Sequence, residues 1–148
     1  MIIGIDASRA LRPNPTGTEL YSARIIQYIA KIDQKNQYLL YTPVEPTAEW
    51  KKLPSNFHWR YIPWPKFWTH IRLPVALFFD KPDILFIPSH VRPLICPTKT
   101  VVTLHDLAFE VFPESYGLLE RYYQKFTAKL ALDKSQQIIV PSNSTKND

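Results

Sequence analysis

Polar side chains that could do chemistry come directly after several short apolar runs of the sequence. They are Asp6 and Arg9, Ser89 and His90, His105 and Asp106, and Ser142 and Ser144. If the runs are parallel strands, their carboxyl ends meet at one edge of the sheet, where open α/β sheets bind ligands. An imidazole there can donate a proton or a hydrogen bond, and a neighbouring carboxylate can orient a substrate hydroxyl, which makes His105 and Asp106 candidates for catalysis. The structural alternative is an imidazole tied to a backbone carbonyl beside a carboxylate that caps a turn.

A second candidate site lies where the first helix is expected to begin. Thr16 and Glu19 have the T-x-x-E spacing of a capping box, which predicts a helix that starts at Gly17. Because Gly17 has no side chain, free N–H groups of the first turn, at Gly17 and Thr18, could approach a phosphate. The alternative is a helix cap with no ligand. The dinucleotide fingerprint G-x-G-x-x-G does not occur here.

Basic and aromatic residues alternate between positions 51 and 72, where no acidic residue occurs. Indole rings settle at the headgroup level of a membrane while Lys and Arg meet anionic lipid, so this stretch predicts membrane contact. The candidate contact residues are Trp64, Lys66, Phe67, Trp68 and Arg72. Stacking on sugars or nucleic-acid bases, and packing of about half of these rings in the core, are the alternatives.

Short apolar runs that alternate with helical patterns predict how these residues are positioned. Continuous runs are typical of strands covered on both faces, and the expected strands are 2–5, 38–42, 59–62, 84–87, 101–104 and 137–140. Apolar residues at three-to-four spacing predict helices over 17–32 and 117–132, and a third helix with a less regular pattern is expected over 68–79. Right-handed crossovers between such elements give a Rossmann-like, doubly wound parallel α/β sheet flanked by helices. Another helix is expected to begin after residue 142.

Composition limits the class of protein. The 148 residues are 45% hydrophobic and 21% charged, which suits one ordinary globular domain over 1–148 and excludes a disordered chain. The net charge of +5 comes from residues 51–148. The single cysteine, Cys96, excludes an intrachain disulfide framework and a multi-cysteine metal site. Without a signal-peptide pattern or a membrane span, a cytoplasmic protein is expected, with peripheral contact to the inner face of the plasma membrane.

Five motifs in a particular order give the sequence a more specific resemblance. They are Ile3-Gly4-Ile5-Asp6-Ala7 with Thr16-Gly17, then Pro82-Asp83-Ile84-Leu85-Phe86, Val101-Val102-Thr103-Leu104-His105-Asp106-Leu107, Phe112-Pro113-Glu114, and Ile139-Val140-Pro141-Ser142-Asn143-Ser144-Thr145. This order resembles the N-terminal half of family 4 glycosyltransferases, over nearly the whole chain. The resemblance implies a GT-B architecture, in which two Rossmann-like domains face each other across a cleft and this chain is the first.

The resemblance also implies a function. It implies retaining transfer of a sugar from a nucleotide-sugar donor to a glycan or lipid-linked acceptor, in polysaccharide biosynthesis, with no metal or other cofactor. The donor-binding C-terminal domain and its E-x7-E motif are absent from 1–148, so this chain is expected to be inactive alone. Catalysis is assigned to His105 and Asp106, and donor phosphate binding to Gly17 and Thr18. Acceptor or cleft roles fall to Arg9, Glu19, Ser89, His90, Glu114, Ser142 and Thr145.

Two other functions compete with this one. A non-catalytic Rossmann-like module could bind anionic glycan or membrane lipid through the basic aromatic stretch. Single-stranded nucleic-acid binding rests only on charge and aromatic content and is disfavoured.

Overall fold

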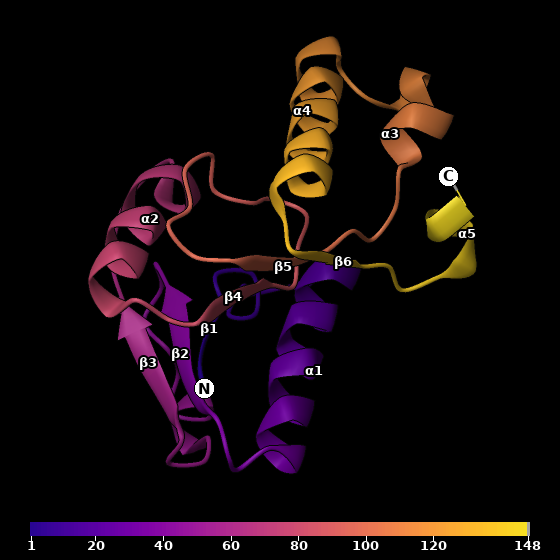
Figure 1. Ribbon diagram of the computed structural model, residues 1–148. Coiled ribbons are helices and arrows are strands. Elements are labelled where there is room, and N and C mark those ends of the chain that lie inside the picture. Colours follow the sequence, from indigo (N-terminus) through magenta and orange to yellow (C-terminus); the bar gives the residue numbers. More distant parts are fainter. Residues whose placement is uncertain (148) are drawn as a thin grey trace.

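The computed structural model describes residues 1–147, which form a parallel α/β sheet flanked by helices (Figure 1). Within these residues the sheet has six strands, all parallel, in the order β3-β2-β1-β4-β5-β6. The strands are β1 (Ile2–Asp6), β2 (Gln37–Thr42), β3 (Phe57–Tyr61), β4 (Ile84–Ile87), β5 (Thr100–Thr103) and β6 (Gln137–Ile139). The predicted doubly wound fold class is therefore confirmed.

Helices cover the two faces of the sheet because neighbouring residues of a strand point to opposite sides. On β2, Leu40 packs in one core cluster with α1 (Gly17–Ile32), whereas Tyr41 packs in the other with α2 (Trp68–Asp80) and α4 (Leu118–Lys134). Figure 1 shows α1 and α4 on opposite sides of the sheet. The remaining helical segments are short: η1 (Trp50–Lys52), α3 (Ala108–Val111), η2 (Pro113–Ser115) and α5 (Asn143–Asn147).

Most element boundaries lie close to those predicted, but β3 begins two residues before its predicted start. The apolar run predicts a start at Trp59, but the strand begins at Phe57, which is buried and pairs in register with Tyr38. His58 lies on the exposed side of β3 and interrupts the apolar run, and its Nε2 lies 3.0 Å from Oε1 of Gln37 on β2. Backbone pairing with β2 therefore determines the start of this edge strand.

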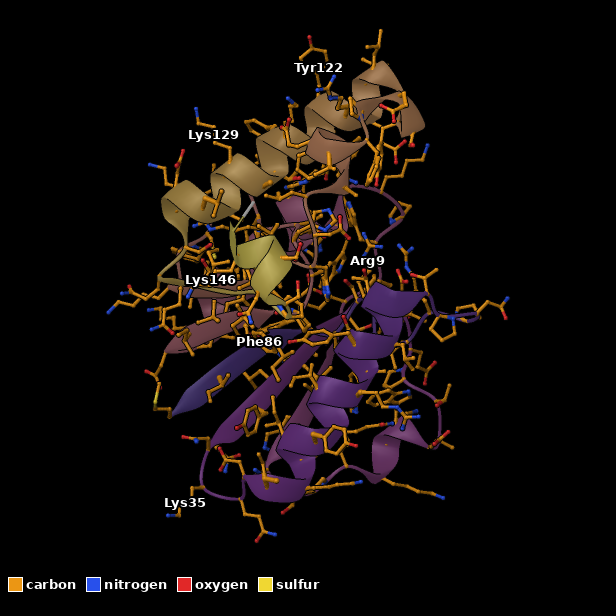
Figure 2. The ribbon with its side chains drawn as sticks, turned by 90° about the vertical axis from the view of Figure 1, so that its right-hand side faces the viewer. Arg9, Lys35, Phe86, Tyr122, Lys129 and Lys146 are labelled. Carbon is orange, nitrogen blue, oxygen red and sulfur yellow. The ribbon has the colours of Figure 1, made fainter. Side chains whose placement is uncertain are left out.

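One part of the sheet carries an apolar groove beside α1. Phe86, Val101 and Ile139 from β4, β5 and β6 line this groove of about 350 Å³ together with Ile25, Ile29 and Ile32 of α1 (Phe86 is labelled in Figure 2). No helix within residues 1–147 is long and apolar enough to cross a bilayer.

Gly4 lies at the tightest point of the sheet and gives a test of the fold. A Cβ at Gly4 would lie 2.9 Å from Cε2 of the fully buried Tyr41 and 3.2 Å from Cδ1 of Leu85. Because a buried ring cannot move away freely, Gly4→Ala should lower the free energy of unfolding by about 1–3 kcal/mol, measured by urea denaturation. Gly17→Ala is the matched control, since its Cβ would meet nothing within 4 Å; an equal loss in both variants would contradict this explanation.

Candidate functional site

The order of the sheet reverses between β1 and β4, and the loops that follow these strands diverge there. Successive strands after β1 are added on one side, while those after β4 are added on the other. In open α/β sheets this switch point is where ligands bind, outside the carboxyl ends of the strands. The polar residues after β1, β4 and β5 therefore share one edge of the sheet, as the sequence predicts.

A large cavity occupies this switch point. Its volume is about 660 Å³, within the range of small-molecule sites. Its lining combines aromatic rings with polar and charged groups from the loops after β1, β2, β3 and β4 and from the helices α2 and α4. The lining residues are Asp6, Ser8, Arg9, Arg12, Pro43, Val44, Trp64, Pro65, Lys66, Phe67, Trp68, Thr69, His70, Ser89, His90, Val91, Glu120, Tyr123 and Gln124.

A smaller cavity of about 140 Å³ adjoins the large one. His90 and Gln124 line both cavities and so form the boundary between them. The smaller cavity lies between the first turn of α1 and the loop after β5, and it is lined by Thr18, His90, His105, Asp106, Phe109, Tyr116 and Gln124. The two cavities together bring most of the predicted site residues into one region.

Asp6 contributes a buried carboxylate to the large cavity. It ends β1, is 3% exposed, and its Oδ1 accepts a hydrogen bond from the backbone N–H of Ser8 at 3.0 Å. No basic side chain within residues 1–147 forms an ion pair with it. Burial raises the pKa of Asp6 above its ordinary value, although the hydrogen bonds from Ser8 and the charge of Arg9 oppose this. Asp6 therefore binds a proton, or accepts a hydrogen bond from a hydroxyl, more readily than an exposed aspartate.

Glu19 is a buried acid of the opposite kind, because it has partners. The backbone N–H of Thr16 donates to its carboxylate, as the capping box predicts. The Thr16 hydroxyl donates to the same carboxylate, and Arg9 forms an ion pair with it at 2.9 Å. Arg12 lies 3.9 Å from the same carboxylate. The Thr16 hydrogen bond, helped by Arg9, lowers the pKa of Glu19 to about 2 against the effect of burial. Glu19 does not line either cavity; it holds Arg9 at the rim of the large one, between α1 and α4 (Figure 2).

His105 is tied to a backbone carbonyl and Asp106 caps a turn, which matches the structural alternative to a catalytic pair. Each side chain still has a second polar atom, Nδ1 of His105 and Oδ2 of Asp106. His105 Nε2 lies 2.8 Å from the Pro88 carbonyl, so Nε2 carries the hydrogen and Nδ1 is the remaining ring nitrogen. Tyr21 packs edge-on against the imidazole, with ring centroids 4.8 Å apart. Asp106 Oδ1 accepts from the backbone N–H of Ala108 and so caps a turn. Both side chains are fixed in orientation while they line the smaller cavity.

Burial favours the neutral form of the other two histidines that line the large cavity, His90 and His70. Burial lowers the pKa of His90, and the nearby charges of Arg9 and His105 lower it further. Burial also lowers the pKa of His70, whose Nε2 lies 3.3 Å from the hydroxyl of Tyr123. Neutral imidazoles can each donate one hydrogen bond and accept another.

Five of the predicted catalytic, donor and acceptor residues lie outside both cavities: Glu19, described above, and Gly17, Glu114, Ser142 and Thr145. Gly17 is at the start of α1, and only its neighbour Thr18 reaches the smaller cavity. Glu114 is exposed in η2. Ser142 caps α5 by accepting from the backbone N–H of Thr145, whose hydroxyl donates to the His105 carbonyl at 3.1 Å. Ser142 and Thr145 therefore support the loop that carries His105.

The predicted membrane residues divide between the cavity and the core. Trp64, Lys66 and Phe67 are exposed at the rim of the large cavity, and the Phe67 backbone has the left-handed φ of 56°. Trp68 is buried, and its Nε1 donates to the Ile62 carbonyl at 2.9 Å, so the prediction that it contacts a membrane is wrong. The guanidinium of Arg72 packs over the Trp64 ring at 5.4 Å.

Sequence reasoning missed His70, Tyr123 and Gln124, and it noted Asp6 without giving it a role. Asp6 had a signal, because it directly follows an apolar strand. Tyr123 and Gln124 had none, since α4 carries large apolar residues around most of its circumference and its sequence does not show which side faces the cavity.

Comparisons with known proteins identify no family. No protein-family model matches the chain, and no curated protein matches its sequence. Within residues 1–147, no three His, Cys, Asp or Glu side chains are grouped so that they could hold a metal ion.

Glu19 gives a pH-dependent test of the site. Because its pKa falls from 4.5 to about 2 on folding, its contribution to stability is complete above about pH 5 and is lost as pH falls toward 2. Glu19→Gln should therefore cost roughly 3 kcal/mol at pH 7 and nothing near pH 2, by chemical denaturation across pH. Glu114→Gln, at an exposed position, should have little effect at any pH; a pH-independent loss in Glu19→Gln would contradict the prediction.

Asp6 should behave in the opposite way. Its raised pKa means that the ionised carboxylate destabilises the folded state at neutral pH. Asp6→Asn keeps the acceptor for Ser8 and should increase the free energy of unfolding at pH 7, with the gain disappearing below about pH 4, the ordinary pKa range of Asp. Asp33→Asn is the control of opposite sign, because hydrogen bonds from Tyr38 and Asn36 lower the pKa of Asp33. A loss of stability in Asp6→Asn at pH 7 would contradict this account.

Proposed function

We propose that this domain forms the acceptor side of a retaining glycosyltransferase that uses a nucleotide-sugar donor. The observation that carries the proposal is the large cavity at the β1–β4 switch point, joined to a smaller cavity that contains His105. The order of motifs that resembles family 4 glycosyltransferases supports the same function. The enzyme would belong to polysaccharide biosynthesis.

The large cavity suits a sugar or glycan acceptor. Sugars present both apolar C–H faces and hydroxyls, so their sites combine aromatic rings with hydrogen-bonding groups. Trp64 and Tyr123 provide rings at the cavity, and Gln124 provides an amide. Asp6 can accept a hydrogen bond from an acceptor hydroxyl, and the destabilising cost of its burial is typical of a residue retained for function.

The smaller cavity suits the phosphate and sugar of the donor. Thr18 lies in the first turn of α1, where backbone N–H groups point at an anion. His105 has its Nε2 engaged with Pro88, so a protonated ring would donate from Nδ1 to charge that develops on the leaving phosphate. In retaining transfer of this kind, the leaving phosphate takes the proton of the acceptor hydroxyl on the same face. Asp106 would orient the loop or an acceptor hydroxyl.

A second domain would complete the site. The resemblance assigns most of the nucleotide-sugar contacts to a C-terminal domain with the E-x7-E motif, a motif that does not occur in residues 1–148. The activity would therefore need both domains.

A second candidate function is a non-catalytic module that binds anionic glycans. Arg9 and Arg12 share the single carboxylate of Glu19, and Lys66 is exposed at the rim of the same cavity. Arg12 and Lys66 could therefore bind the acid group of a carboxylated or phosphorylated glycan, while Asp6 and Glu120, which line the same cavity, would accept hydrogen bonds from its hydroxyls.

Transfer by the complete enzyme tests the proposal. The reading frame beyond Asp148 should encode a second α/β domain with E-x7-E, and the complete protein should transfer sugar from a nucleotide-sugar, detected by mass spectrometry. His105→Ala should then lower the transfer rate by about 10²-fold, since it removes a charge-stabilising group.

Asp106→Asn is the matched control for that loop, because an amide keeps the acceptor that caps Ala108 but loses the charge. A small effect of Asp106→Asn beside a large effect of His105→Ala would assign the role to the imidazole. Near-normal transfer by His105→Ala would overturn the role of His105. Saturable glycan binding with a stop codon after Asp148 would favour the second candidate.

A further inference from the structure

The outward side of α2 is apolar although it faces solvent. Leu73 and Leu77 are buried on the sheet side, while Ile71, Val75, Phe78 and Phe79 are exposed, Phe78 and Phe79 to 62% and 75%. A helix with apolar residues on both sides is expected to be covered on both sides. Within residues 1–147, no other helix or strand covers this outward side.

The loop between β4 and β5 extends the same apolar surface. Ile95, 78% exposed, and Pro97 lie beside the outward residues of α2. Together they form a groove of about 310 Å³ lined only by apolar residues, which are Pro74, Val75, Phe78, Phe79, Ile95 and Pro97. An exposed apolar groove of this kind marks an interaction surface.

The charges around this surface are almost all positive. Residues 51–104 contain eight basic and two acidic residues. Both acids are engaged, because Asp80 binds Arg60 through both oxygens and Asp83 accepts from the backbone N–H of Ile2 at 2.7 Å. Three exposed lysines that flank α2 or end the loop have no ion pair within residues 1–147. They are Lys66 just before α2, Lys81 just after it and Lys99 at the end of the loop.

We propose that the outward side of α2 and the loop tip 94–97 form a docking surface for an anionic lipid bilayer. The apolar side chains would enter the headgroup–acyl boundary, and the lysines at both ends of α2 would meet anionic headgroups. The exposed apolar side of α4 is less suited, since residues 108–134 contain four basic and four acidic residues. This surface does not include the buried Trp68, and it does not depend on the glycosyltransferase proposal.

Vesicle co-sedimentation of the chain at low salt tests this surface. Vesicles of equimolar phosphatidylcholine and phosphatidylglycerol should retain the protein at least about tenfold better than phosphatidylcholine alone, and added salt should release it. The double variant Phe78→Ser/Phe79→Ser should lower the partition coefficient by more than about tenfold. Lys81→Glu/Lys99→Glu should lower it by a similar factor and should abolish the preference for the anionic vesicles.

Leu119→Ser/Tyr122→Ser on α4 is the matched control, because it removes two exposed apolar side chains from a surface of balanced charge. It should leave vesicle binding unchanged, and cooperative thermal unfolding should be retained in all variants since the changed residues are exposed. Equal binding to neutral vesicles, or equal loss in the α4 control, would overturn the proposal. The proposal would also be overturned if the unchanged protein failed to bind vesicles but formed a dimer that Phe78→Ser/Phe79→Ser dissociates. The surface would then bind a second copy of this chain.

Discussion

Parallel pairing of β1 with β2 on one side and β4 on the other is the constraint on which the rest of the structure depends. Both neighbours approach β1 so closely that Gly4 leaves no room for a Cβ beside Tyr41 and Leu85. Since the chain extends the sheet in opposite directions from these two pairings, the loops after β1 and β4 diverge. The large cavity lies at this divergence.

Two buried acids next to this point have opposite effects on the stability of the folded state. Glu19 accepts three hydrogen bonds, from the hydroxyl and N–H of Thr16 and from the guanidinium of Arg9, so its ionised form stabilises the start of α1. Asp6 accepts hydrogen bonds from Ser8 but lacks an ion-pair partner in the described part of the chain, and its burial raises its pKa. The structure therefore fixes Arg9 firmly while it leaves a carboxylate at the cavity whose charge destabilises the fold, an imbalance found at functional sites.

The proposed acceptor site and the proposed bilayer surface both involve α2. The N-terminal end of this helix, with Phe67 and Trp68, borders the large cavity, and its outward side carries the proposed bilayer surface. Under both proposals, docking through that side would place the domain at the lipid surface, where a lipid-linked acceptor would also lie. Such an arrangement would explain why apolar residues are retained on the solvent side of a helix whose buried side already packs against the sheet.

The sequence alone determined the parallel α/β class, the six strands and the start of α1, because apolar periodicity and the Thr16–Glu19 capping box are local signals. It also indicated that Asp6, His90 and His105 share one sheet edge, since parallel strands end together. Only the tertiary structure decided that Glu19 is a buried ion-pair partner, that Trp68 is core and that Tyr123 and Gln124 reach the cavity. These outcomes depend on which side of a helix packs against segments far away in the sequence, and α2 and α4 carry apolar residues on both sides, so their own periodicity could not specify the orientation.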